Sequence, residues 1–219
     1  SHHFPTGIVT PIKRRRELLR WAASKRGRYI IEDDYDSEFR YDAKPLPSLQ
    51  SIDDHGRVIY LGTFSKVLLP SVRMGYLVLP PSLASVYHER SAAYNQTASR
   101  IEQLALARMI REGELEKQLR RLRKLYSAKG ELLIRSLQKE FGNTIQIAIQ
   151  ETALRAVVSP GIDEDTAQLC ALAAKQDVLV LPFGENQRPG RVLLGFSGIA
   201  QEEIPEAVHR LSLAWGTKI

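Results

Sequence analysis

Residues 61–79 read Leu-Gly-Thr-Phe-Ser-Lys-Val-Leu-Leu-Pro-Ser-Val-Arg-Met-Gly-Tyr-Leu-Val-Leu, and Lys66 is the most informative residue in this stretch. An expected strand ends in small hydroxyl residues, and Lys66 and then Arg73 follow. We expect packing to desolvate Lys66 in part, which favours the neutral, nucleophilic amine that attacks a carbonyl. Thr63, Ser65 and Arg73 supply hydroxyl donors and a planar cation, which are groups that bind a phosphate. Pyridoxal 5′-phosphate (PLP), an aldehyde that carries a phosphate, requires both kinds of group.

A second motif, Tyr-Ile-Ile-Glu-Asp-Asp-Tyr-Asp-Ser-Glu-Phe at 29–39, supports the same interpretation. A short strand ends there in acids and then a tyrosine, which is the usual place for site residues in an open α/β sheet. One carboxylate can keep the pyridine nitrogen of PLP protonated, and a tyrosine can donate to the phenolic oxygen of the ring. Because consecutive strand residues point to opposite faces, we expect Asp33 rather than Asp34 to share a face with Tyr35.

Together these motifs resemble the fold-type I PLP-dependent aminotransferases. The runs at 31–39, 62–66 and 69–76 more narrowly resemble the MocR/GabR-type transcriptional regulators. Those proteins fuse a winged helix-turn-helix DNA-binding domain to an aminotransferase-like effector domain. The resemblance extends through nearly all of residues 1–219.

The resemblance implies a role for each residue that matches the family motifs. It makes Lys66 the Schiff-base lysine, Asp33 the partner of the pyridinium nitrogen and Tyr35 the contact to the phenolic oxygen. Arg73 matches the phosphate-binding arginine, and Thr63 and Ser65 are its helpers. Each residue alone also has a structural interpretation, since lysines in turns are usually solvated and an aspartate can cap a loop.

Two positions depart from the aminotransferase pattern. Phe4 stands where those enzymes carry the asparagine of Asn-Pro-Thr-Gly, and Leu193 stands where they carry the arginine that binds the substrate α-carboxylate. Arg191 and Arg188 lie nearby, but neither is in register with that arginine. Arg191 precedes Leu193 by two residues and can therefore share its face of a strand, so we predict Arg191 as a substitute carboxylate ligand.

The pattern along the chain predicts an α/β fold, in which part of a fold-type I large domain, a mostly parallel sheet with helices, precedes a small C-terminal α+β subdomain. We assign 1–113 to the PLP-binding large domain, 114–141 to a long amphipathic connecting helix and 142–219 to the small subdomain. Within the subdomain we expect a helix over 163–174 with Asp163 as its N-cap. Family domains carry well over a hundred residues before the turn at 5–7, so we expect the chain to be the second part of an effector domain.

Composition excludes several other classes. No apolar run is long enough to span a bilayer and no signal peptide is present, so a cytoplasmic protein is expected. The single cysteine, Cys170, reads as a packing residue, and the five histidines have no metal-binding spacing. The net charge of +6 is modest, and the basic clusters 14–16 and 120–124 read as solvated helix faces. No helix-turn-helix is found within these residues.

Three functions fit these residues. The first is a PLP-binding effector domain of a MocR/GabR-type regulator, in which an amino acid or amine forms an aldimine at Lys66 and changes how an attached module binds DNA. The alternative is a catalytically active aminotransferase, and the third is a fragment that binds no cofactor and only dimerises. We favour the regulator over the enzyme, with a homodimer as its expected state. The sequence identifies neither the effector nor the operator.

Overall fold

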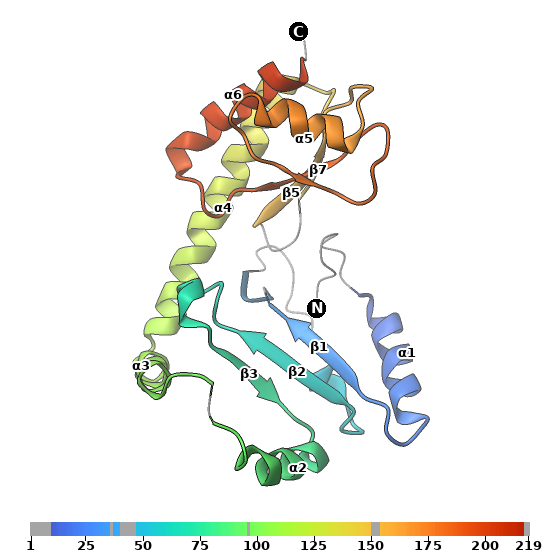
Figure 1. Ribbon diagram of the computed structural model, residues 1–219, viewed down its shortest axis with the longest axis vertical. Coiled ribbons are helices and arrows are strands. Elements are labelled where there is room, and N and C mark those ends of the chain that lie inside the picture. The colour runs from blue at the N-terminus through green and yellow to red at the C-terminus, as the bar shows by residue number, and fades with distance from the viewer. Residues whose placement is uncertain (1–9, 36, 40–46, 96, 150–153, 217–219) are drawn as a thin grey trace. The chain divides into compact units, whose positions relative to one another are not determined.

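The computed structural model describes residues 10–35, 37–39, 47–95, 97–149 and 154–216 (Figure 1). The chain divides into two compact units, Ser1–Arg121 and Leu122–Ile219. The division falls inside the helix α4 (Glu114–Phe141), which spans the segment expected to be a connecting helix. None of the described helices is long and apolar enough to cross a membrane.

The first unit is built on a three-stranded sheet of β1 (Ile30–Asp34), β2 (Val58–Thr63) and β3 (Gly75–Val78), in the order β1-β2-β3. β1 pairs with β2 in parallel, and β2 pairs with β3 antiparallel. Their β-branched and aromatic residues favour extended backbone. β3 begins only at Gly75, two residues after Arg73, which adopts a left-handed conformation with φ of 51°.

Helix α1 (Ile12–Ala23) packs its apolar stripe against this sheet, where Leu19 joins a small core with Leu49 and Val58. The expectation that the basic cluster 14–16 is a solvated helix face is wrong for Arg15, because its side chain is buried. Its guanidinium donates to the carbonyl oxygens of Thr10, at 2.9 Å, and of Pro47. These bonds offset the cost of removing the charged group from water.

Short 3₁₀ turns and two helices complete the described part of the first unit. The turns are η1 (Ser37–Phe39), η2 (Gln50–Ile52) and η3 (Pro70–Val72). The helices are α2 (Pro81–Ser91) and α3 (Arg100–Arg111). Figure 1 shows α2 and α3 beyond β3, on the side of the sheet away from β1 and α1.

The second unit contains a four-stranded antiparallel sheet in the order β4-β5-β7-β6. Its strands are β4 (Gln146–Ile149), β5 (Arg155–Ser159), β6 (Leu181–Pro182) and β7 (Val192–Gly195). The helices α5 (Thr166–Ala174) and α6 (Ile204–Trp215) and the turn η4 (Gln201–Glu203) complete it.

One face of this sheet carries the main hydrophobic core. Alternate strand residues such as Val158 and Val192 pack with Leu137 of α4 and with apolar residues of α5 and α6. The indole of Trp215 belongs to this core. Its Nε1 donates to the Leu169 carbonyl at 3.1 Å, so the buried N–H group has a hydrogen-bond partner. Cys170 on α5 is partly buried beside this core, and burial raises the pKa of its thiol, in keeping with a packing role.

The N-cap of α5 is Asp165 and not Asp163, so the expected cap was wrong by two residues. The Asp165 carboxylate accepts from the Gln168 amide at 2.8 Å, and the Gln168 side chain accepts from the Asp165 amide at 3.1 Å. This reciprocal pair is a capping box, which requires a Gln or Glu three residues after the cap. Thr166 stands at that distance from Asp163 and cannot serve.

We predict that Asp165→Ala lowers the melting temperature and that Asp163→Ala does not. The hydrogen bond from the Gln168 amide is the first cause that lowers the Asp165 pKa. The stabilisation is therefore complete above the usual aspartate pKa of about 4 and is lost as the pH falls through the lower folded-state value. Thermal melts of both variants between neutral and strongly acidic pH measure this difference. A gap that persists in strong acid would contradict the capping role.

We predict that Leu137→Ala lowers the free energy of unfolding by about 2–5 kcal/mol, because the truncation leaves a cavity in the main core. Leu137 is fully buried, whereas Leu125 on the same helix is 38% exposed. Leu125→Ala makes the same chemical change and should cost less than about 1 kcal/mol. Denaturant unfolding of the two variants measures both values, and equal losses would show that the core is placed incorrectly.

Candidate functional site

Lys66 lies on the tight turn that follows β2. The Phe64 carbonyl closes this turn by accepting from the amides of Val67, at 3.1 Å, and Leu68, at 2.8 Å. Val67 is buried beneath the turn and anchors it, while the Lys66 side chain is exposed. The expected partial burial of Lys66 is therefore wrong for this chain, because the described elements pack under the turn and not over the amine.

A second lysine shows the contrast. Lys129 on α4 is buried, and its ammonium donates to the backbone carbonyls of Ser197, at 3.1 Å, and Ile199. Hydrogen bonds to carbonyls occupy this amine in a structural role. Lys66 makes no hydrogen bond to any described residue, so its amine is available to an aldehyde.

The two predicted hydroxyl donors lie together at the end of β2. Thr63 Oγ1 donates to Ser65 Oγ at 3.1 Å and accepts from the Ser65 amide at 3.2 Å. Thr63 Oγ1 also lies 3.4 Å from the Met74 carbonyl, and the Phe64 amide donates to the same carbonyl at 3.1 Å. These bonds hold the residue after Arg73 against the hydroxyl pair.

Arg73 has an unusual backbone. It ends η3 with φ of 51° and ψ of 35°, in the left-handed region that favours glycine. An ordinary side chain held there costs on the order of 1 kcal/mol or more, and such strain gathers at functional sites. The guanidinium is exposed. The Met74 bonds described above bring the Arg73 backbone close to Thr63, so the cation and the hydroxyls can serve one anionic group.

At the end of β1 the two aspartates point to opposite faces, as predicted. Asp33 pairs with Leu61 and is exposed, on the face that also carries Thr63. Asp34 is buried on the other face, where its Oδ2 accepts from the Tyr60 hydroxyl at 2.7 Å. Burial is the main reason that the Tyr60 pKa lies far above its usual value, and the Asp34 carboxylate adds to it. Tyr35 is half-buried just beyond the strand.

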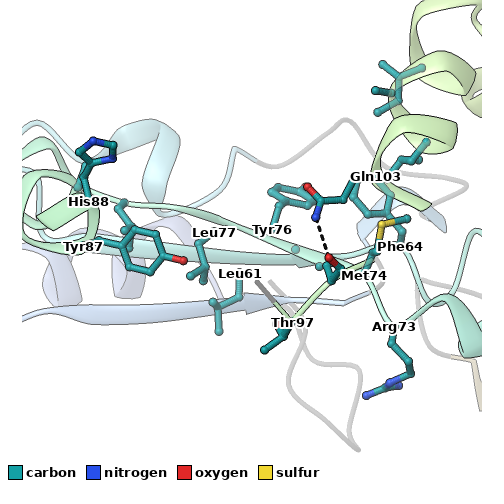
Figure 2. Close-up of a pocket in the computed structure, with 18 residues that line it drawn as sticks. Leu61, Phe64, Arg73, Met74, Tyr76, Leu77, Tyr87, His88, Thr97 and Gln103 are labelled. Atoms are coloured by element: carbon teal, nitrogen blue, oxygen red, sulfur yellow. Dashed lines mark hydrogen bonds between the residues drawn. The ribbon is translucent and has the colours of Figure 1, made fainter. Parts of the chain in front are cut away.

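The first unit also contains an open cavity of about 920 Å³ between β3, α2 and α3. Figure 2 shows Arg73 at one end of it and Tyr87 with His88 at the other. Lys66 and Asp33 are not among its lining residues, so the cavity touches the predicted site only through Arg73. Gln103 lies on its α3 side, where its amide donates to the Ala98 carbonyl at 3.0 Å. Sequence reasoning missed this cavity because nothing in the α2 and α3 patterns marks their exposed apolar residues as a lining.

In the second unit, Arg191 immediately precedes β7. Its guanidinium lies 5.1 Å from the centre of the Phe183 ring, and the Phe183 side chain packs with buried Leu193. Arg191 therefore lies beside the cluster that contains Leu193. Arg188 is turned to other partners, namely Asp163 at 3.5 Å and Gln168 at 2.9 Å. Phe4 lies outside the described residues.

The donor set of the first unit fits PLP. The groups that an aldehyde, a pyridinium and a phosphate require are present: an exposed primary amine, an exposed carboxylate on the face of a hydroxyl pair, and an exposed guanidinium near that pair. Across the described ranges, no group of three or more His, Cys, Asp or Glu side chains is placed to hold a metal ion.

Known proteins are similar to this sequence over nearly its whole length. The chain is 41% identical over 219 residues to an uncharacterised HTH-type transcriptional regulator, YdeL, of Bacillus subtilis (strain 168), covering 98% of this chain and 47% of the relative. It is 31% identical to the probable rhizopine catabolism regulatory protein MocR of Rhizobium meliloti, covering 98% and 44%. The chain thus spans about half the length of the curated relatives it matches. These relatives confirm the predicted resemblance to MocR-type regulators.

Solved structures confirm the predicted fold class. The kynurenine aminotransferase of Pyrococcus horikoshii superposes with a TM-score of 0.81 at 25% identity, over 98% of this chain and 55% of that one. Residues 1–211 match the family described as aminotransferase class I and II. PLP is the cofactor that belongs with this family, as the sequence predicted. The motif around Lys66, the strand that ends at Asp33 and the match over residues 1–211 lead to one conclusion: this chain belongs to the aminotransferase class I and II family.

Proposed function

We propose that this chain is the PLP-binding effector domain of a MocR-type transcription regulator, which responds to an amino acid or amine at PLP held by Lys66. The observation that carries the proposal is the 41% identity to an HTH-type regulator over 98% of the chain. The arrangement of the candidate residues Lys66, Asp33 and Thr63 supports it. The DNA-binding module, the homodimer and the cytoplasmic location belong to the proposal. So does the assignment of 1–113 to the large domain, 114–141 to the connecting helix and 142–219 to the small subdomain.

Each site residue has a distinct task in this proposal. When bound, PLP supplies an aldehyde for amines and an electron-withdrawing ring. Lys66 supplies the amine that holds the aldehyde, and Asp33 holds the proton on the ring nitrogen. Tyr35 donates to the phenolic oxygen. Arg73, with the Thr63 and Ser65 hydroxyls, binds the phosphate and fixes its orientation.

The apolar character of the Leu193 site favours sensing over turnover. An arginine in its place would bind the α-carboxylate of a substrate by two charge-assisted hydrogen bonds. Leu193 offers none, and Arg191 beside Phe183 is the substitute that we propose. A sensor needs occupancy by its effector, whereas a transaminase needs the substrate held rigidly through proton transfer. The active aminotransferase is the second candidate, and the intact set of Lys66, Asp33 and Tyr35 supports it.

We predict that the full-length gene product takes up PLP with a visible absorbance that borohydride reduction fixes onto Lys66. Lys66→Ala should abolish the absorbance, because no other amine then holds the aldehyde. Lys25→Ala removes an exposed lysine of the same unit and should leave the absorbance unchanged. Absorbance titration and peptide mass spectrometry measure the outcome. An unchanged spectrum in Lys66→Ala would end the PLP–lysine assignment.

We predict that Arg191→Ala weakens binding of an amino acid effector, which carries a carboxylate, and leaves PLP binding intact. Loss of a charge-assisted contact should reduce effector affinity by roughly tenfold or more. Arg188→Ala, a matched change of an arginine that already pairs with Asp163, should have little effect. Spectral titration with a panel of amino acids and amines, followed by operator binding, measures both variants. Rapid half-transamination of a common α-amino acid by the wild type would instead favour the aminotransferase.

A further inference from the structure

The face of the first sheet opposite Asp33 carries a row of polar and aromatic side chains that no part of the proposed PLP chemistry uses. The row runs across all three strands, from Asp34 on β1 to Tyr60 on β2 and Tyr76 on β3. The Tyr60 hydroxyl donates to Asp34 Oδ2 at 2.7 Å, and the Tyr60 and Tyr76 rings lie 6.0 Å apart. Burial is the main cause that raises the pKa of both phenols, and each phenol also influences the pKa of the other.

A glycine makes this row possible. Gly62 pairs with Asp34 on one side and with Tyr76 on the other, so its position is in the middle of the row. A Cβ atom at residue 62 would lie 2.2 Å from Cζ and 2.5 Å from Oη of Tyr76. The phenol end of Tyr76 therefore occupies the space above Gly62, directed across the sheet toward Tyr60. Any larger residue at position 62 must displace it.

The row is joined at both ends to candidate cofactor-binding residues. At one end Asp34 is the immediate neighbour of Asp33, and the strand alternation that buries one carboxylate presents the other. At the other end the Tyr76 ring packs 5.4 Å from the ring of Phe64, the residue whose carbonyl closes the Lys66 turn. The Phe64 amide also bonds to Met74, next to Arg73.

We propose that Asp34, Tyr60 and Tyr76 are positioning residues, which hold Asp33 and the Lys66 turn in place from the opposite face of the sheet. This inference rests on the proposed function, because it concerns how the same site is kept in order. The buried Asp34 carboxyl cannot rotate to the other face without losing its bond to the Tyr60 phenol. The end of β1 is thereby fixed with Asp33 on the Thr63 side.

The test is Tyr60→Phe in the full-length gene product, which removes one hydroxyl and keeps the ring. Tyr29→Phe is the matched control, since Tyr29 lies just before the same strand and its ring contact with Arg57 survives the change. We measure the dissociation constant of PLP, the pH midpoint of the visible absorbance of lysine-bound PLP, and the melting temperature. Tyr60→Phe should weaken PLP binding by roughly tenfold, as expected for loss of one hydrogen bond to a carboxyl, and shift the pH midpoint, whereas Tyr29→Phe should do neither.

A double-mutant cycle separates positioning from a general loss of stability. If Tyr60 acts through Asp33, then Tyr60→Phe shifts the pH midpoint in the wild type and has no further effect in an Asp33→Asn background. An equal shift in both backgrounds would overturn the inference, and so would wild-type behaviour of Tyr60→Phe. A wild-type protein that takes up no PLP would overturn the proposed function as well, so the two failures are distinguishable.

Discussion

The parallel pairing of β1 with β2 is the constraint on which the candidate site depends. It places Asp33 opposite Leu61, on the face that carries Thr63, so that a carboxylate and a hydroxyl separated by thirty residues in sequence lie on the same side of one sheet. Thr63 then bonds to Ser65 and lies against Met74, and this brings the Lys66 turn and Arg73 to the same strand end. A shift of β1 by one residue would exchange the exposed and buried aspartates, so that Asp33 would no longer lie on the face of Thr63.

Much of this arrangement could be predicted from sequence because the determinants are local. Strand alternation alone separates Asp33 from Asp34, and the run from Gly62 to Lys66 implies a turn after a strand. The features that were missed depend on contacts distant in sequence. Arg15 is buried because Pro47, more than thirty residues away, supplies a carbonyl. The left-handed backbone of Arg73 could not be predicted either, because glycine is the residue that usually indicates this conformation and position 73 is an arginine.

In the second unit, too, features with local determinants could be predicted, whereas features that depend on packing could not. Apolar periodicity was sufficient to predict an α+β subdomain and a helix that ends at residue 174. It was not sufficient to choose between Asp163 and Asp165 as a cap, since both precede the same apolar run. The choice rests on Gln168, whose side chain can return to only one of the two. Leu193 could be identified as a departure, yet its burial with Phe183 and Val157 is a property of packing that no pattern of single residues contains.

The three consecutive acids at the end of β1, Glu32, Asp33 and Asp34, have different roles. A buried carboxylate requires a hydrogen-bond donor or a cation, whereas water hydrates an exposed one. Glu32 accepts from the amides of Leu49 and Gln50, at 2.9 and 3.1 Å, and so ties η2 to the sheet. Asp34 accepts from Tyr60. Among the described residues Asp33 alone of the three has no such donor, and it is the one that is exposed. The exposed Asp33 carboxylate is therefore the one of the three that a protonated ring nitrogen would pair with.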